Sequence, residues 1–272
     1  IIVEKTMNKG ETMRFLVTND DGIYAEGLIQ LASSLTDIGD VTVVAPENER
    51  SATGHAITMH FPLRVRKVKL PGLDIDAYAV DGTPADCVKL GIDKLLEEQP
   101  DFVFSGINRG SNLGTDVLYS GTVAAAIEGC IMGVRSAAFS LLLGDEMDYA
   151  YSGKVAKEVA KIISSNDLPP NTLINVNIPN VSEEQIQGMK VTRLGRRRYS
   201  KNYEKREDPR GRTYYWLAGR LIEEESGTDY DINAVNDNYV SITPLHFDLT
   251  NYNMIETLKS WGFEKETISK AK

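Results

Sequence analysis

Residues 15–22 read FLVTNDDG, three apolar residues and a threonine followed by four residues that favour a turn. A short apolar run bounded by turn residues is typical of a buried strand. Leu28, Leu31 and Leu35 follow at the spacing of one face of a helix. A strand, an acidic turn and an amphipathic helix, in that order, predict one unit of a parallel sheet, with the acidic turn at the carboxyl end of the strand.

The alternation of strand and helix continues to about residue 180. Further strands are expected at 41–44, 77–80, 102–104, 137–142 and 173–178, shorter ones in a lateral excursion at 57–59 and 63–68, and further helices at 84–95, 123–132 and 149–163. Thr83 suits an N-cap and Pro84 the first helical position. Repeated alternation of this kind predicts an α/β fold whose mostly parallel sheet is covered by helices on both faces.

The composition changes after Pro179. Residues 190–250 are rich in Arg, Tyr, Thr and Glu, and the β-prone runs at 213–217 and 239–243 are interpreted as hairpin strands of an appendage, followed by a last helix. The opening residues, IIVEKTMNKGET, contain no initiator methionine and are too charged for a signal peptide. The expected division is therefore an N-terminal extension or vector remnant at 1–12, a catalytic core at 13–189 and a β-rich C-terminal region at 190–272.

Charge and cysteine content narrow the function classes. With 30 Lys and Arg against 39 Asp and Glu, the chain carries a net charge of −9, which argues against a protein that binds duplex DNA or RNA mainly through phosphate charge. Its two cysteines exclude a disulfide framework and favour the reducing cytoplasm. No apolar run is long enough to span a bilayer, so no membrane partner is expected.

Polar loops follow several of the predicted strands, and the carboxyl ends of such strands are where open α/β sheets bind ligands. Asp20 and Asp21 follow the first strand, Ser51 follows the second and Asn108 follows the strand at 102–104. Two carboxylates with a hydroxyl and an amide oxygen suit Mg²⁺ or Mn²⁺. A plain turn and helix cap is the competing interpretation of Asp-Asp-Gly. Zinc is disfavoured, because His55, His60 and His246 are scattered.

Ser120, Gly121 and Thr122 stand at the start of the predicted helix at 123–132. Backbone N–H groups at a helix start attract phosphate, and a glycine allows close approach of the ligand. Simple N-capping by Ser or Thr is the alternative. The first strand is followed by neither GxGxxG nor a GxxxxGK[ST] sequence, which disfavours a dinucleotide site there and a P-loop NTPase.

Seven segments of the chain, taken in order, resemble the family of the stationary-phase survival protein SurE. They are LVTNDDGI at 16–23, VAP at 44–46, RSATG at 50–54, GTPADCV at 82–88, SGINRG at 105–110, SGTV at 120–123 and YVSITPL at 239–245. Each segment alone is weak evidence for the resemblance, whereas the seven segments in this order are highly specific for the family.

The resemblance implies a Rossmann-like three-layer αβα core with a C-terminal extension that assembles a homodimer or homotetramer. It also implies a nucleotidase that removes phosphate from nucleoside 5′- or 3′-monophosphates, sometimes also trimming polyphosphate, with one divalent metal ion per subunit. The family's metal ligands fall on Asp20, Asp21, Ser51 and Asn108, and its phosphate contacts fall around Asn108, Gly121 and Thr122.

The resulting hypothesis is a metal-dependent phosphohydrolase. Ser51, Asn108 and the helix start at Ser120 to Thr122 would bind the phosphate, and either Asp20 or Asp21 would act as a base toward water or attack phosphorus directly. Two other classes compete with this hypothesis. A signalling receiver module also carries paired acids after its first strand, and a nucleotide sensor would bind nucleotide without releasing phosphate.

Overall fold

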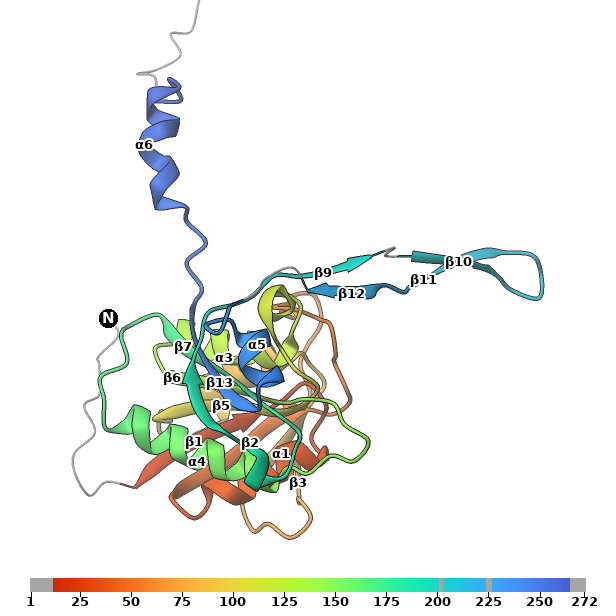
Figure 1. Ribbon diagram of the computed structural model, residues 1–272. Coiled ribbons are helices and arrows are strands. Elements are labelled where there is room, and N and C mark those ends of the chain that lie inside the picture. The colour runs from red at the N-terminus through yellow and green to blue at the C-terminus, as the bar shows by residue number, and fades with distance from the viewer. Residues whose placement is uncertain (1–11, 201–202, 224–226, 265–272) are drawn as a thin grey trace, which may run out of the picture.

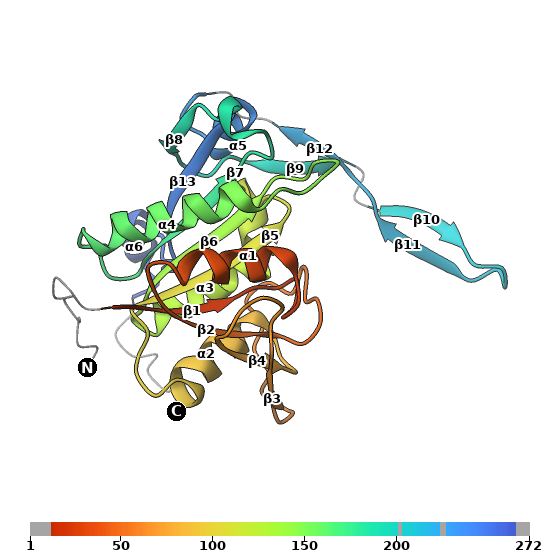
Figure 2. The same ribbon diagram turned by 90° about the horizontal axis from the view of Figure 1, so that it is seen from below.

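The computed structural model describes residues 12–200, 203–223 and 227–264. The extension expected at 1–12 lies almost entirely outside these residues. The expected α/β class is confirmed, because a nine-stranded sheet has the order β3-β4-β2-β1-β5-β6-β7-β13-β8 and helices cover both of its faces (Figures 1 and 2). The strands are β1 Met13–Thr18, β2 Gly39–Pro46, β3 Val65–Val68, β4 Asp76–Val80, β5 Phe102–Arg109, β6 Arg135–Leu141, β7 Thr172–Ile178, β8 Gly188–Val191 and β13 Tyr239–His246.

The central strands β4, β2, β1, β5, β6 and β7 run parallel, whereas β3 and β13 run antiparallel to the neighbours that join them to this set. Parallel strands need crossover connections, and here helices supply all of them except the one from β2 to β4, which runs through a loop and β3. The helical elements between β1 and β8 are α1 Glu26–Leu35, α2 Pro84–Leu90, η1 Gly91–Leu95, η2 Gly114–Leu118, α3 Gly121–Ile131, α4 Ala150–Ser164 and η3 Glu183–Gln185.

Alternate residues of β1 face the two helical layers. Phe15 and Val17 pack into the cluster that contains Leu28 of α1 and Val155 of α4. Leu16 packs into a second cluster with side chains of α2 and α3. This division follows from the period of two along a strand, and it shows that the apolar run at the first strand is buried on both faces.

The lateral excursion differs from the sequence-based expectation. Residues 57–59 form no strand, and the strand expected at 63–68 is shortened to β3. The backbone N–H of Thr58 donates instead to Oδ1 of Asp86 at 2.9 Å, and its hydroxyl donates to Oδ2 at 2.6 Å. Because a side chain of α2 satisfies this part of the loop, no ladder partner is needed. The cap expected at Thr83 and Pro84 is confirmed as a capping box.

The run at 239–243 is not a hairpin strand, which corrects the sequence-based interpretation. It belongs to β13, which pairs antiparallel with β7 and parallel with β8 inside the main sheet. Helix α5, Asp231–Asn236, packs beside β13 and buries Ile232 and Val235 against Leu113. The boundary expected between residues 189 and 190 falls within β8. The buried Val240 explains the difference, because this strand needs a sheet on which to pack.

Two segments stand away from this body. Strands β9 Arg197–Ser200 and β12 Arg220–Glu223 form one antiparallel pair, and β10 Tyr203–Glu207 and β11 Thr213–Leu217 form another, so the hairpins expected around 213–217 are confirmed. Figures 1 and 2 show these pairs in line as a projecting arm. Helix α6, Tyr252–Ser260, buries none of its residues and stands clear of the sheet in Figure 1.

Candidate active site

The order of strands reverses between β1 and β5. From β1 the chain moves to β2 and β4 in one direction, whereas β5, β6 and β7 extend in the other. Loops that follow strands on the two sides of such a reversal diverge and leave a crevice at the carboxyl edge of the sheet. The loop of residues 19–22 follows β1 and Asn108 lies near the end of β5, so the sheet brings the acidic turn and the amide to one crevice.

Asp20 is held against the start of α3. Only 4% of Asp20 is exposed, and the hydroxyl of Thr122 donates to its Oδ1 at 2.5 Å. A Cβ added to Gly121 would lie 2.9 Å from Oδ2 of the same carboxylate. Glycine is therefore required at this position, since any side chain would push the carboxylate away from the helix.

Asp20 and Asp21, here called the acid pair, lie in surroundings that favour the binding of a cation. Burial raises the pKa of Asp20 to about 6, the hydrogen bond from Thr122 opposes this rise and the charge of Asp21 adds to it. Burial also raises the pKa of Asp21, while the N–H of Arg109 lowers it and the charge of Glu49 raises it. Two adjacent carboxylates that ionise with difficulty are stabilised when a cation binds between them.

The end of β5 reaches the same acid pair. The backbone N–H of Arg109 donates to Oδ2 of Asp21 at 3.1 Å. The side-chain Nδ2 of Asn108 donates to the carbonyl of Gly110 at 2.7 Å, and its Oδ1 accepts no hydrogen bond from the residues that the structure describes. A carboxamide oxygen is an ordinary ligand for a hard cation.

The loop that carries Ser51 is attached to the acidic turn through the residue before it, Arg50. The N–H of Arg50 donates to the carbonyl of Asp20 at 2.7 Å, so the loop after β2 is anchored on the acidic turn. The hydroxyl of Ser51 itself donates to Oε1 of Glu49 at 2.7 Å. Because the Ser51 hydroxyl is the donor in this hydrogen bond, the lone pairs of its oxygen remain available to a cation. Sequence reasoning missed Glu49, a third carboxylate near Asp21, whose only signal is its place in the loop after the second strand.

At the start of α3 the N-cap interpretation is confirmed, and the phosphate contact stays a prediction. The Oγ of Ser120 accepts the N–H of Val123 at 3.1 Å, so Ser120 is an N-cap. The side chain of Thr122 bonds to Asp20, a pairing that no spacing in the sequence indicated. The first N–H groups of a helix have no intrahelical acceptor, and here they open beside the acid pair.

Comparison with known proteins identifies the family. The model of the family described as "Survival protein SurE" matches residues 15–201. The chain belongs to the SurE family. It is 50% identical over 258 residues to the 5′-nucleotidase SurE of Natranaerobius thermophilus, covering 93% of this chain and 100% of that protein. The 5′-nucleotidase SurE of Pelotomaculum thermopropionicum is 54% identical over 248 residues, covering 91% of this chain and 94% of that protein.

A solved SurE structure shares the fold. The crystal structure of the SurE protein from Aquifex aeolicus has a TM-score of 0.81 and 42% identity, and the match covers 92% of this chain and 99% of that one. The expected Rossmann-like architecture is therefore confirmed, with added hairpin strands toward the C-terminus.

In this member of the SurE family His55, in the loop after β2, has a structural partner. Nε2 of His55 lies 2.9 Å from Oε2 of Glu128, and Nζ of Lys89 donates to its Oε1 at 3.0 Å. These contacts tie the loop after β2 to α2 and α3. In the described part of the chain no group of three or more His, Cys, Asp or Glu side chains is placed to hold a metal ion. A metal in this SurE chain would therefore need neutral oxygens besides the two aspartates.

Two further expectations concern the rest of the chain. Cys87 and Cys130 are both free and buried, as the sequence indicated. Among the residues that the structure describes, no helix combines the length and the apolar character needed to cross a bilayer.

Proposed function

We propose that this member of the SurE family is a metal-dependent phosphohydrolase that converts nucleoside 5′-monophosphates and water into nucleosides and inorganic phosphate. The observation that carries the proposal is the contact between two chemically different halves of one site. The acid pair at the end of β1 suits a cation, and the start of α3, which suits a phosphate, is bonded to it through Thr122 and Asp20. The two relatives named 5′-nucleotidase SurE support the choice of substrate.

The donor set fits a hard divalent cation. Asp20 and Asp21 supply charge in a buried setting that raises the pKa of both carboxyls, and the oxygens of Ser51 and Asn108 would complete the ligand set. One ion of Mg²⁺ or Mn²⁺ per subunit is the cofactor proposed here, because both metals prefer such oxygens. When bound, the ion supplies positive charge to the phosphoryl group and lowers the pKa of a water molecule.

Residues of the chain itself would position the phosphate and act on the reacting atoms. Thr122 holds Asp20 in place, and Ser120, Gly121 and Thr122 present the N–H groups of the α3 start to the phosphate oxygens. We assign Asp20 and Asp21 as the catalytic pair, which either removes a proton from water or attacks phosphorus directly. If water attacks, its oxygen bonds to phosphorus as the bond from phosphorus to the sugar oxygen breaks, and the proton taken from water goes to the departing sugar oxygen. If an aspartate attacks, the same bond breaks, an aspartyl-phosphate forms, and water then hydrolyses it to release phosphate and restore the carboxylate, while the sugar oxygen leaves as a hydroxyl with a proton that this water replaces.

The proposal extends to nucleoside 3′-monophosphates and polyphosphate. The groups named so far contact only the phosphoryl end of a substrate, so they do not select the position of the phosphate on the sugar. The two free, buried thiols support a place in the cytoplasm.

We further assign catalysis to residues 13–189 and assembly of a homodimer or homotetramer to residues 190–272. The projecting arm and α6 support this assignment, because they expose large apolar side chains that a partner subunit would cover. Examples are Tyr215, Trp216 and Leu217 in the arm and Trp261 and Phe263 directly after α6. β13 belongs to the core sheet, so it is an exception to the division.

Phosphate release from AMP and GMP tests the proposal. Chelator-stripped protein is assayed alone, with Mg²⁺ and with Mn²⁺, beside Asp21→Asn and a control, Asp167→Asn, whose exposed side chain lies in the loop before β7. Release should require metal, fall at least a hundredfold in Asp21→Asn and persist in the control. Metal-dependent release at the normal rate by Asp21→Asn would refute the site, and no release by the unmodified protein would refute the activity.

A further inference from the structure

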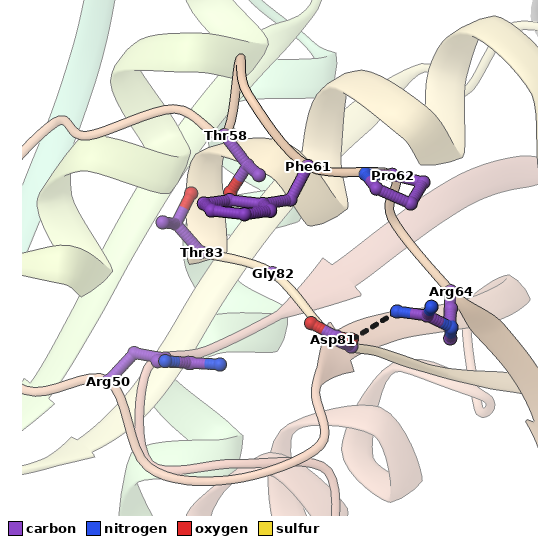
Figure 3. Close-up of a pocket in the computed structure, with 8 residues that line it drawn as sticks. All are labelled: Arg50, Thr58, Phe61, Pro62, Arg64, Asp81, Gly82 and Thr83. Atoms are coloured by element: carbon purple, nitrogen blue, oxygen red, sulfur yellow. Dashed lines mark ion pairs between the residues drawn. The ribbon is translucent and has the colours of Figure 1, made fainter.

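A pocket of about 320 Å³ opens next to the candidate active site and has no role in the chemistry described so far (Figure 3). A volume near 300 Å³ is at the small end of the range of ligand sites in proteins. The lining residues are Arg50, Thr58, Phe61, Pro62, Arg64, Asp81, Gly82 and Thr83. Arg50 joins the pocket to the acid pair, because its own backbone N–H donates to the carbonyl of Asp20.

Hydrogen bonds within the chain hold the floor of the pocket. Asp86, of which 3% is exposed, accepts the N–H of Thr83 at 2.9 Å and both donors of Thr58. The hydroxyl of Thr83 donates to the carbonyl of Ala56 at 2.7 Å. One buried carboxylate therefore joins the loop of residues 56–58 to the start of α2, and this fixes the positions of Thr58 and Thr83 in the floor of the pocket.

An aromatic ring forms one side of the pocket. Phe61 is 78% exposed, and Figure 3 shows its ring beside Thr83. An exposed phenylalanine on a loop that a buried carboxylate anchors offers a flat face for stacking.

The charged groups of the pocket lie away from the ring in Figure 3. Arg64 and Asp81 pair across 3.6 Å, and both are exposed, so their remaining hydrogen-bonding capacity is accessible. The guanidinium of Arg50 extends toward Asp81 in Figure 3, and it forms no ion pair with any carboxylate in the described residues. A flat apolar face beside donors and an acceptor matches the chemistry of a nucleobase.

We propose that this pocket binds the base of the nucleotide substrate, with the base stacked on Phe61, the polar edge of the base toward Arg64 and Asp81, and the sugar passing Arg50 toward the acid pair. The orientation follows from the chain, because Arg50 is anchored on Asp20 whereas Phe61 lies at the far end of the loop. This inference rests on the proposed function and adds the part of the site that distinguishes a nucleotide from other phosphate esters.

The test compares AMP with ribose 5-phosphate, which lacks the base. Phe61→Ala should lower kcat/KM for AMP about tenfold and leave kcat/KM for ribose 5-phosphate nearly unchanged, since stacking on an aromatic ring contributes about that much to binding. Phe61→Trp should restore the preference for AMP. Met59→Ala is the matched control, because Met59 is equally exposed on the same loop but does not line the pocket. Equal losses for both substrates, or no loss for AMP, would overturn the assignment.

Binding of adenosine, measured by saturation-transfer NMR, separates failure of this inference from failure of the proposed function. Adenosine carries no phosphate, so its binding does not depend on catalysis. Saturable binding to the unmodified protein that weakens about tenfold in Phe61→Ala supports the pocket even if no phosphate is released from AMP. Adenosine that does not bind, or that binds equally to both proteins, would overturn the pocket while leaving metal-dependent hydrolysis in place.

Discussion

The hydroxyl of Thr122 donates to Oδ1 of Asp20 at 2.5 Å, although 102 residues separate them in the sequence. This bond joins the acidic turn after β1 to the first turn of α3. It places the group suited to a cation and the group suited to a phosphate in direct contact, and the contact carries the proposed function. It also makes residue 122 the most direct place to test how far the site depends on its own geometry.

Thr122→Val should impair both stability and activity. Valine has the shape of threonine without the hydroxyl, so Oδ1 of the buried Asp20 would lose its donor, at a cost of about 1–3 kcal/mol in the free energy of unfolding. Urea unfolding and phosphate release measure the two effects. Thr122→Ser keeps the hydroxyl and should stay near the unmodified protein in both assays. A valine variant as stable and active as the serine variant would show that the bond does not support the site.

Gly121→Ala should lower activity more than stability. The new Cβ would lie 2.8 Å from Cβ of Asp20, so the carboxylate must move, and small displacements in an active site cost about tenfold to a hundredfold in rate. Gly129→Ala, in the same helix, is the control, because its Cβ would crowd Val103 at 2.7 Å in the core. It should unfold at a lower temperature yet keep its activity per folded molecule. The same loss of activity in both variants would trace the effect to the helix as a whole.

Glu128→Gln should alter how stability depends on pH. Hydrogen bonding by His55 is the main cause that lowers the pKa of the Glu128 carboxyl below its usual 4.5, and Lys89 adds to it while burial opposes it. A lowered pKa in the folded state means that ionised Glu128 stabilises the protein above about pH 4.5, and that this contribution is lost as pH falls through the folded-state pKa.

The glutamine variant should therefore be less stable by about 1 kcal/mol at pH 7 and should match the unmodified protein at pH 3, measured by urea unfolding. Glu183→Gln removes one member of the exposed pair with Lys154 and should have little effect at either pH. A stability difference for Glu128→Gln that is equal at both pH values would contradict the assignment.

Asp231→Ala should be among the most destabilising single changes. This fully buried carboxylate accepts the N–H groups of Gly114 at 2.7 Å, Gly195 at 2.8 Å and Ile232 at 2.9 Å. Its loss would leave three buried donors without an acceptor, at a cost above about 3 kcal/mol. Thermal unfolding measures the loss.

Asp229→Ala is the matched control, because Asp229 is an exposed neighbour that pairs with Arg193. If the two variants melt at the same temperature, the buried contacts of Asp231 do not brace the loop that leads from Gly114 to α3.

The local features of the site were predictable from the sequence. The strand at 15–18, the turn after it and the capped helix at Pro84 each follow from residues that are neighbours in the chain, and the structure has all three. Contacts between distant residues were not predictable in this way. Spacing along the chain carries no information on the hydrogen bond from Thr122 to Asp20. Nothing in the sequence indicated that Asp231 is buried, because its segment was interpreted as part of an appendage.

The sequence by itself determined the alternation of strands and helices and the polar loops at the strand ends, because side-chain periodicity and turn propensity act over a few residues. Only the tertiary structure decided which strands are neighbours. That pairing places the reversal of strand order between β1 and β5, draws β13 into the main sheet and brings α3 against the acidic turn. The free energy of these contacts comes from surfaces that meet only when the whole sheet has assembled, so no local pattern records them.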